Sequence, residues 1–165
     1  MSVVWHRLED LPGKGFDEVP NSCGIYLLRW AKNSKPVPVS RIGGIDKQGL
    51  LYIGKAKRLK RRLRRLWRSI YERDLDSHTA GKTIILCNFP EIVNKAEYEI
   101  AWESTEGEEG QEWNALVQYA RRYKELPPLN LLVGRETYGI WGLGKWGKSK
   151  WAIEPDDFVK AALGS

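Results

Sequence analysis

The chain has 165 residues, 42% of them hydrophobic, and a net charge of +6. These totals predict one domain, residues 1–165, with a real core, and they make a polyanion a plausible partner. Cys23 and Cys87 form no zinc-binding pattern with the two histidines, so buried free thiols in a reducing compartment are expected. No signal peptide and no run of about 20 apolar residues is visible, which predicts a soluble, cytoplasmic protein without membrane association.

The first third of the chain predicts two strands joined by a long connection. Residues 23–30 are rich in β-branched and aromatic side chains and predict the first strand, and residues 50–53 predict the second. Residues 32–49 contain two prolines and three glycines, which favours a loop or an irregular hairpin. A hairpin connection makes the strands antiparallel neighbours, and Tyr26 and Tyr52 can then lie side by side on one face.

A strongly basic helix is predicted directly after the second strand, with Gly54 at the turn. Nine of the fourteen residues from 55 to 68 are Lys or Arg. One apolar stripe runs through them at helical spacing and consists of Leu59, Leu63, Leu66 and Ile70. The segment is therefore expected to be a packed helix with basic outer faces, and Arg62 is expected to border its apolar stripe.

The remaining chain predicts one more strand and two more helices. Residues 72–82 are polar and turn-like, and residues 83–87 predict either a short strand or the start of a helix. Alternation over residues 98–102 predicts a third strand, and a helical stripe over residues 111–124 ends at a Pro-Pro pair. A short helix is expected over residues 155–163. The predicted class is α/β (α+β): a small three-stranded, mainly antiparallel sheet flanked by helices.

Glu112 heads the apolar stripe of the helix at residues 111–124, where a carboxylate needs a cation or hydrogen-bond donors. Interaction with the helix dipole is a second explanation for its position. Together with Tyr26, Tyr52 and Arg62, it suits phosphodiester chemistry. Arg62 would neutralise transition-state charge, Glu112 would hold Mg²⁺ (or Mn²⁺) mostly through water, and a tyrosine hydroxyl would orient or deprotonate the attacking water.

These residues lie in motifs that follow one another in a defined order: Gly24-Ile25-Tyr26, Tyr52-Ile53-Gly54, Arg62, Glu112 and Pro127-Pro128-Leu129-Asn130. Over residues 19–131 this order resembles the GIY-YIG nuclease family, and residues 52–63 are especially similar to the amino-terminal nuclease domain of the excision-repair protein UvrC. The resemblance implies a single-metal endonuclease that leaves 5′-phosphate and 3′-hydroxyl ends, as in repair, restriction or recombination. It makes Tyr26, Tyr52, Arg62 and Glu112 the catalytic residues, with Glu112 as metal ligand.

DNA is the implied partner, with RNA as the alternative. The residues expected to contact it are the cations around the basic helix and two later polar residues: Lys55, Lys57, Arg58, Lys60, Arg61, Arg64, Arg65, His78 and Asn130. Asn130 has a structural role as its alternative.

Three features depart from the family. The insertion at residues 32–49 lengthens the spacing between the two tyrosines. The glutamate stands farther from the Pro-Pro motif than in UvrC, so Glu108 or Glu109 is an alternative to Glu112.

Leu66 stands where many family members have His or Tyr. Tyr71 or His78 would have to substitute there, with Lys55 assisting. The departure favours an alternative function, a catalytically inactive nucleic-acid-binding module. The Trp/Gly/Lys-rich extension at residues 132–165 adds a third hypothesis, a docking surface for a protein partner.

Overall fold

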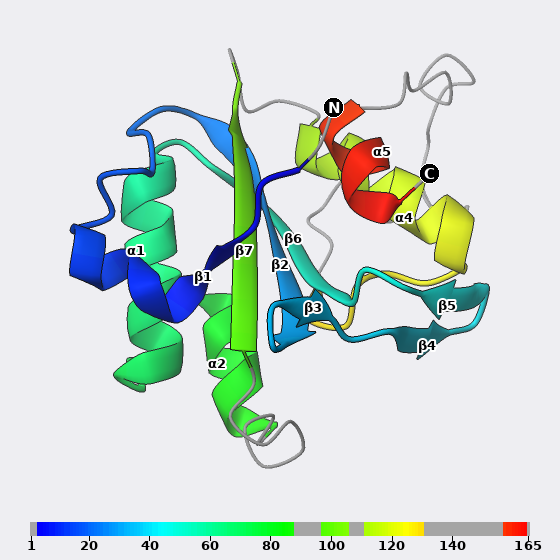
Figure 1. The fold of residues 1–165 in the computed structure, drawn as a ribbon, viewed down its shortest axis with the longest axis horizontal. Coiled ribbons are helices and arrows are strands. Elements are labelled where there is room, and N and C mark those ends of the chain that lie inside the picture. The colour runs from blue at the N-terminus through cyan, green and yellow to red at the C-terminus, as the bar shows by residue number, and fades with distance from the viewer. Residues whose placement is uncertain (1–2, 88–96, 106–110, 131–156, 165) are drawn as a thin grey trace.

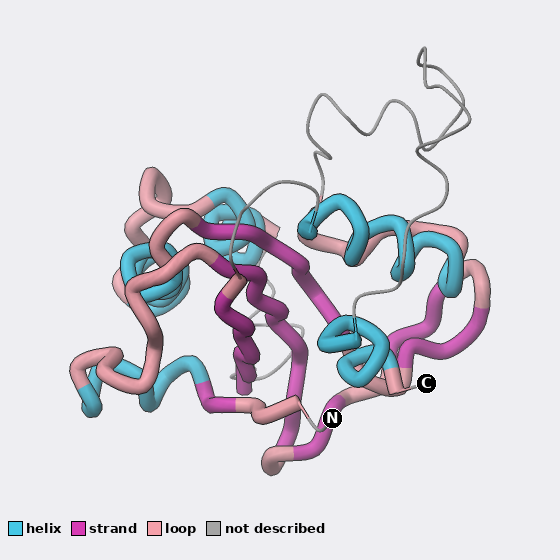
Figure 2. The backbone as a smooth tube through the Cα atoms, turned by 90° about the horizontal axis from the view of Figure 1, so that it is seen from above, coloured by secondary structure: helices cyan, strands magenta, loops and turns pink. Residues whose placement is uncertain are grey.

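The computed structural model describes residues 3–87, 97–105, 111–130 and 157–164. An antiparallel sheet lies between two groups of helices (Figures 1 and 2). Its strands are β1 (His6–Arg7), β2 (Gly24–Lys32), β3 (Lys35–Pro36), β6 (Leu50–Ala56) and β7 (Glu97–Ser104). A separate hairpin consists of β4 (Val39–Arg41) and β5 (Gly44–Asp46). The helices in the described ranges are the 3₁₀ helix η1 (Leu8–Lys14), α1 (Leu59–Tyr71), α2 (Thr79–Leu86), α4 (Gln111–Tyr123) and α5 (Asp157–Leu163).

The central strand is β2, which pairs antiparallel with β7 on one edge and with β6 on the other. The expected α/β class and the antiparallel pairing of the first two long strands are confirmed. The sheet has five strands instead of three, because the two-residue strands β1 and β3 extend it beside β7 and β2. The irregular connection at 32–49 contains β3 and the β4–β5 hairpin.

Both faces of the sheet are covered, so β2 is buried along almost its whole length. Tyr26 and Leu28 belong to the core under η1, α1 and α2. Ile25 and Leu27 belong to the core under α4 and α5 on the opposite face. Because a strand covered on both faces needs apolar side chains in both directions, β2 lacks the polar alternation of a half-exposed strand.

The expected turn at Gly54 is wrong. Gly54 lies inside β6 opposite Tyr26, and the strand continues to Ala56 by pairing with the start of β2. The basic helix therefore begins at Leu59 rather than at residue 55. No side chain caps its first turn, and its first amides instead donate to backbone carbonyls, from Leu59 to Ser22 over 2.9 Å and from Lys60 to Pro20 over 3.1 Å.

A second helix packs beside α1 on the same face. Residues 79–82, expected to form a turn, are the first residues of α2, so the apolar run after them is helical. Gly81 permits the close approach, since a Cβ there would lie 2.5 Å from the Cβ and Oγ atoms of Ser69 in α1. The residue before α2 is His78, whose position follows from this contact between the two helices.

Several expectations fall outside the described residues, among them Glu108, Glu109 and residues 132–156 of the Trp-rich extension. The helix expected near the end of the chain is present as α5 and packs against α4. The expected burial of both thiols is wrong, because Cys23 is half-buried and Cys87 is exposed. None of the helices in the described ranges has the length and apolarity needed to cross a membrane.

Candidate active site

Three side chains from three elements meet at the hydroxyl of Tyr26 in β2. Arg62 of α1 donates its Nε–H to the Tyr26 oxygen over 3.1 Å. The Nε2 atom of His78 lies 2.8 Å from the same oxygen. Tyr26 is fully buried and His78 is only 3% exposed. A phenol is thus held in the core by a cation from one helix and an imidazole from the start of another.

Tyr52 lies beside this group, as its predicted place on the same face requires. Its ring centroid is 5.8 Å from that of Tyr26 and 5.7 Å from that of His78. Gly54 provides the space for both phenols, because a Cβ there would lie 2.5 Å from a Tyr52 ring carbon and 2.6 Å from the Tyr26 hydroxyl. The glycine is therefore a close-packing position within a strand.

Burial controls the ionisation of this cluster. Burial raises the pKa of Tyr26 well above its usual range, and the neighbouring Tyr52 raises it further. Burial and the nearby Glu112 carboxylate raise the pKa of Tyr52. Burial, followed by the charges of Arg62 and Arg65, lowers the pKa of His78 to about 3. At neutral pH both phenols are protonated and the imidazole is neutral.

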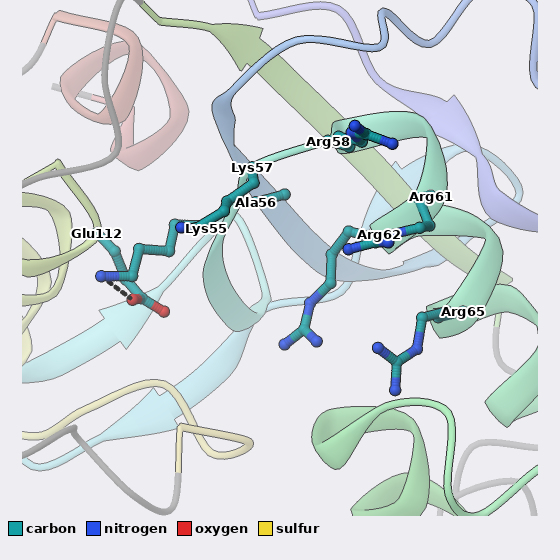
Figure 3. A pocket seen from close by; sticks show the side chains of 8 residues that line it. All are labelled: Lys55, Ala56, Lys57, Arg58, Arg61, Arg62, Arg65 and Glu112. Carbon is teal, nitrogen blue, oxygen red and sulfur yellow. Dashed lines mark ion pairs between the residues drawn. The ribbon is translucent and has the colours of Figure 1, made fainter.

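A pocket of about 310 Å³ opens next to the cluster, between the end of β6, the start of α1 and α4 (Figure 3). Six cations and one carboxylate line it together with Ala56: Lys55, Lys57, Arg58, Arg61, Arg62, Arg65 and Glu112. Arg62 is the link between the two regions, since its Nε contacts the buried phenol while the side chain also lines the pocket. Tyr26 and Tyr52 do not line it.

Glu112 lies across the pocket from the arginines of α1, where Figure 3 shows it beside Lys55. The Lys55 ammonium is 3.9 Å from the Glu112 carboxylate, and the Glu112 side chain is 26% exposed. Among the residues that the structure describes, no three His, Cys, Asp or Glu side chains gather as a metal cage. One carboxylate at an open pocket fits Mg²⁺, which binds few protein ligands and retains several waters.

Two of the residues expected to bind DNA are buried instead. His78 is in the Tyr26 cluster. Asn130 clamps β6: its Oδ1 accepts from the Ile53 amide over 3.0 Å, and its Nδ2 donates to the Ile53 carbonyl over 2.8 Å. The structural alternative for Asn130 therefore describes its contacts. By holding Ile53, it fixes the strand that carries Tyr52 and Gly54.

Two other expected DNA contacts lie on the basic helix outside the pocket. Lys60 pairs with Asp17 over 3.1 Å. Arg64 donates to the Gly15 carbonyl over 3.0 Å and stacks over Phe16. The cations of α1 that were expected to contact DNA thus divide into one group at the pocket and another bound to the segment before β2.

His78 was named from the sequence, with Tyr71, as a substitute for the polar side chain missing at position 66, but its contact with Tyr26 was not predicted. It stands 52 residues from Tyr26 in the chain, and histidine is outside the group of residues that most often cap helices. The signal for it was the leucine at position 66, where many members of the family that the sequence resembles have His or Tyr.

Comparisons with protein-family models, with curated proteins and with solved structures found no match for this chain.

Proposed function

We propose that this protein is a GIY-YIG-type endonuclease that hydrolyses phosphodiester bonds in DNA with the help of Mg²⁺. The observation that carries the proposal is the double contact of Arg62, which touches the buried phenol of Tyr26 and lines a pocket rich in cations. A guanidinium held in this way is preorganised for a phosphate, because it needs no reorientation when charge develops on the phosphate oxygens.

The charge of the pocket supports a polyanionic substrate. Six cations and a single carboxylate line its walls. The start of α1 also lacks an acidic residue in its first turn. Because a helix N-terminus is already positive, the adjacent cations Arg58 and Arg61 increase the local potential. Bound phosphates would relieve this repulsion, and the same charges would steer nucleic acid to the pocket.

The residues present fit a metal-assisted hydrolysis. Glu112 would hold Mg²⁺, which when bound lowers the pKa of its water and neutralises phosphate charge. Arg62 would donate to a non-bridging oxygen of the scissile phosphate and stabilise the charge that builds there. Lys55, beside Glu112, would keep a second positive charge next to the same phosphate. Tyr52, which is 8% exposed, is the phenol nearer to solvent.

The reaction itself balances as a simple displacement. The oxygen of water forms a bond to phosphorus while the bond from phosphorus to the 3′ oxygen breaks. The departing 3′ oxygen takes up a proton, and the attacking water gives up one. The products are a 5′-phosphate and a 3′-hydroxyl.

A nicking assay on supercoiled and branched DNA tests the proposal, with and without Mg²⁺. Wild type is expected to cleave only with the metal, whereas Arg62→Ala and Glu112→Gln are expected to bind DNA without cleaving it. Glu72→Gln, at an exposed glutamate beyond the end of α1, is the matched control and should cleave normally. Metal-independent cleavage, or full activity in both site variants, would refute the proposal.

A nucleic-acid-binding module without catalysis is the second candidate. It is favoured by the full burial of Tyr26 and by the absence of both phenols from the pocket lining. It predicts salt-dependent binding with no turnover on DNA or RNA under any metal. The same assay separates the two functions, since only an enzyme shows multiple turnovers that depend on Arg62.

A further inference from the structure

His78 is bound on both sides of its ring. On one side, Nδ1 accepts a hydrogen bond from the Ala80 amide over 3.1 Å, as the cap of α2. An amide N–H can only donate, so Nδ1 carries no proton. The ring is neutral, because burial and the charges of Arg62 and Arg65 lower the His78 pKa to about 3. Its single proton is therefore on Nε2, the atom that faces Tyr26.

This tautomer determines the direction of the hydrogen bond to Tyr26. The Nε2–H group donates to the phenol oxygen over 2.8 Å, and Arg62 donates to the same oxygen from its Nε–H over 3.1 Å. A hydroxyl oxygen has two acceptor positions and one proton. With both positions filled, the Tyr26 hydroxyl is left only as a donor, and the neighbouring phenol is that of Tyr52.

The pKa shifts of the two phenols agree with this donor and acceptor order. Burial raises the pKa of both, but Tyr52 raises the Tyr26 pKa further, whereas Tyr26 lowers the Tyr52 pKa. Such opposite effects are expected when Tyr26 donates and Tyr52 accepts. Of the two phenols, Tyr26 is thus the fixed donor and Tyr52 the one whose ionised form is better supported.

We propose that His78 is a positioning residue of this site: together with Arg62 it fixes the Tyr26 hydroxyl as a donor toward Tyr52, in place of the polar side chain that Leu66 does not provide. Its catalytic consequence rests on the proposed nuclease function. The hydrogen-bond order itself does not, because it follows from the contacts of the free protein.

The packing of α2 explains how a residue from outside α1 reaches this position. Leu66 is fully buried among apolar side chains and has no polar group. Gly81 brings α2 against Ser69, and the Ser69 hydroxyl donates to the His78 carbonyl over 3.3 Å. The ring then faces Tyr26 of β2, Tyr52 of β6, and Arg62 and Arg65 of α1.

The first test needs no catalysis. Nitrogen-15 NMR of the histidine rings in the full chain reports tautomer and charge, and the chain has only two histidines to assign. His78 is expected to show the Nε2–H tautomer near pH 7 and to remain unprotonated at about pH 5, well below the ordinary histidine pKa of about 6.5. An Nδ1–H tautomer, or titration close to that ordinary value, would overturn the inference whether or not DNA is cleaved.

The second test separates positioning from helix capping with two variants. His78→Asn keeps an acceptor for the Ala80 amide but is too short to reach Tyr26, and His78→Gln keeps a neutral donor at the distance of Nε2 but loses the cap. We expect His78→Asn to lower kcat by roughly 10- to 100-fold with little change in KM, and to change the pH profile of kcat. We expect His78→Gln to retain most of the rate.

A purely structural role predicts the opposite order, with His78→Asn close to wild type and His78→Gln the worse variant. That order would overturn the inference, as would an unchanged pH profile in His78→Asn. If wild type cleaves no substrate, the nuclease proposal fails, and the NMR result alone decides whether His78 holds the Tyr26 hydroxyl.

Discussion

Two of the buried polar clusters in the part of the chain that the structure describes lie on opposite faces of the sheet. The first surrounds Asp46 at the end of β5, which is fully buried next to α4. It accepts hydrogen bonds from five groups: the amides of Gln48, Gly49 and Leu50 and the hydroxyls of Tyr119 and Tyr123. The second surrounds Tyr26 under α1 and α2, with Arg62 and His78 as donors.

The clusters differ in which parts of the molecule their hydrogen-bond partners belong to. The partners of Asp46 hold the inserted segment at 32–49 against α4, and none of them lines the basic pocket. In the Tyr26 cluster, one donor is a cation that also lines that pocket. Whether a buried polar group serves stability or function is therefore better inferred from the surface that its hydrogen-bond partners line than from its burial alone. We expect the first cluster to control stability and the second to control chemistry.

The largest expected effect is on stability, from Asp46→Ala. The variant leaves several buried donors without an acceptor, so it is expected to lower the free energy of unfolding by about 3–5 kcal/mol. Urea denaturation followed by circular dichroism measures the loss, and Tyr119→Phe, which removes one donor, should cost about 1 kcal/mol. DNA binding by the folded fraction should be unchanged. A loss below about 1 kcal/mol for Asp46→Ala would contradict this role.

Arg62→Ala is expected to do the opposite: it should lower kcat strongly and change the free energy of unfolding only slightly. Loss of a preorganised donor to the transition state is expected to reduce kcat by about 10²–10³-fold. The free energy of unfolding should change by less than about 1 kcal/mol, because the guanidinium is partly exposed at the pocket. Arg68→Ala, on the same helix but outside the pocket, is the matched control and should retain normal kcat. Equal losses in both variants would show a general charge effect instead.

Gly54→Ala tests whether the two phenols need the space that the glycine leaves. The added methyl group would meet both phenols within 2.6 Å. Overpacking is expected to cost about 1–3 kcal/mol of stability, and the displaced phenols should also lower kcat. Gly13→Ala is the control, because nothing lies within 4 Å of a Cβ at that position. A variant as stable and active as Gly13→Ala would show that the phenols move apart without consequence.

The strands and the long helices could be predicted from the sequence because their own side chains specify them. The β2 strand and the stripe of α1 are examples, since β2 is rich in β-branched and aromatic residues and apolar residues recur in α1 with the helical period. The boundary between β6 and α1 could not, because Lys55 and Ala56 are held in the strand by pairing with β2. A glycine before a basic segment predicts a turn, whereas here Gly54 leaves space for the ring of Tyr52 in its own strand and for the ring of Tyr26 in β2.

The sequence predicted which residues of the candidate site lie close together, but not how deeply each of them is buried. The sequence placed Tyr26, Tyr52 and Arg62 close together, and the structure brings them together. It did not indicate that Arg62 lines the pocket while the two phenols are buried beneath it, because the burial of each side chain depends on how α1 and α2 cover the sheet. His78 is placed in the cluster by the contact between Gly81 of α2 and Ser69 of α1. A contact between two helices at a single glycine produces no periodic pattern in the sequence.

The neutral state of His78 gives the stability a predictable pH dependence. Its pKa is about 3 in the folded protein, because of burial and the Arg62 and Arg65 charges, and about 6.5 when unfolded. As the pH falls below about 6.5, the unfolded state takes up a proton that the folded state does not. This group should therefore lower the stability by up to about 1.4 kcal/mol per pH unit. Urea titrations between about pH 6.5 and 5 should show a shallower slope in His78→Asn; equal slopes would contradict a neutral buried ring.

The smallest expected effect is on the salt dependence of DNA binding, and it distinguishes which cations of α1 contact phosphate. Arg61 lines the pocket, whereas Arg64 is bound to the Gly15 carbonyl outside it. Arg61→Gln is expected to reduce the slope of log Kobs against log salt by about 0.9, equally for all DNA sequences, because one phosphate contact is lost. Its effect on stability should stay within about 0.5 kcal/mol. If Arg64→Gln reduces the slope equally, DNA lies along the whole basic helix; if only Arg61→Gln does, the path of the backbone is confined to the pocket that Arg62 lines.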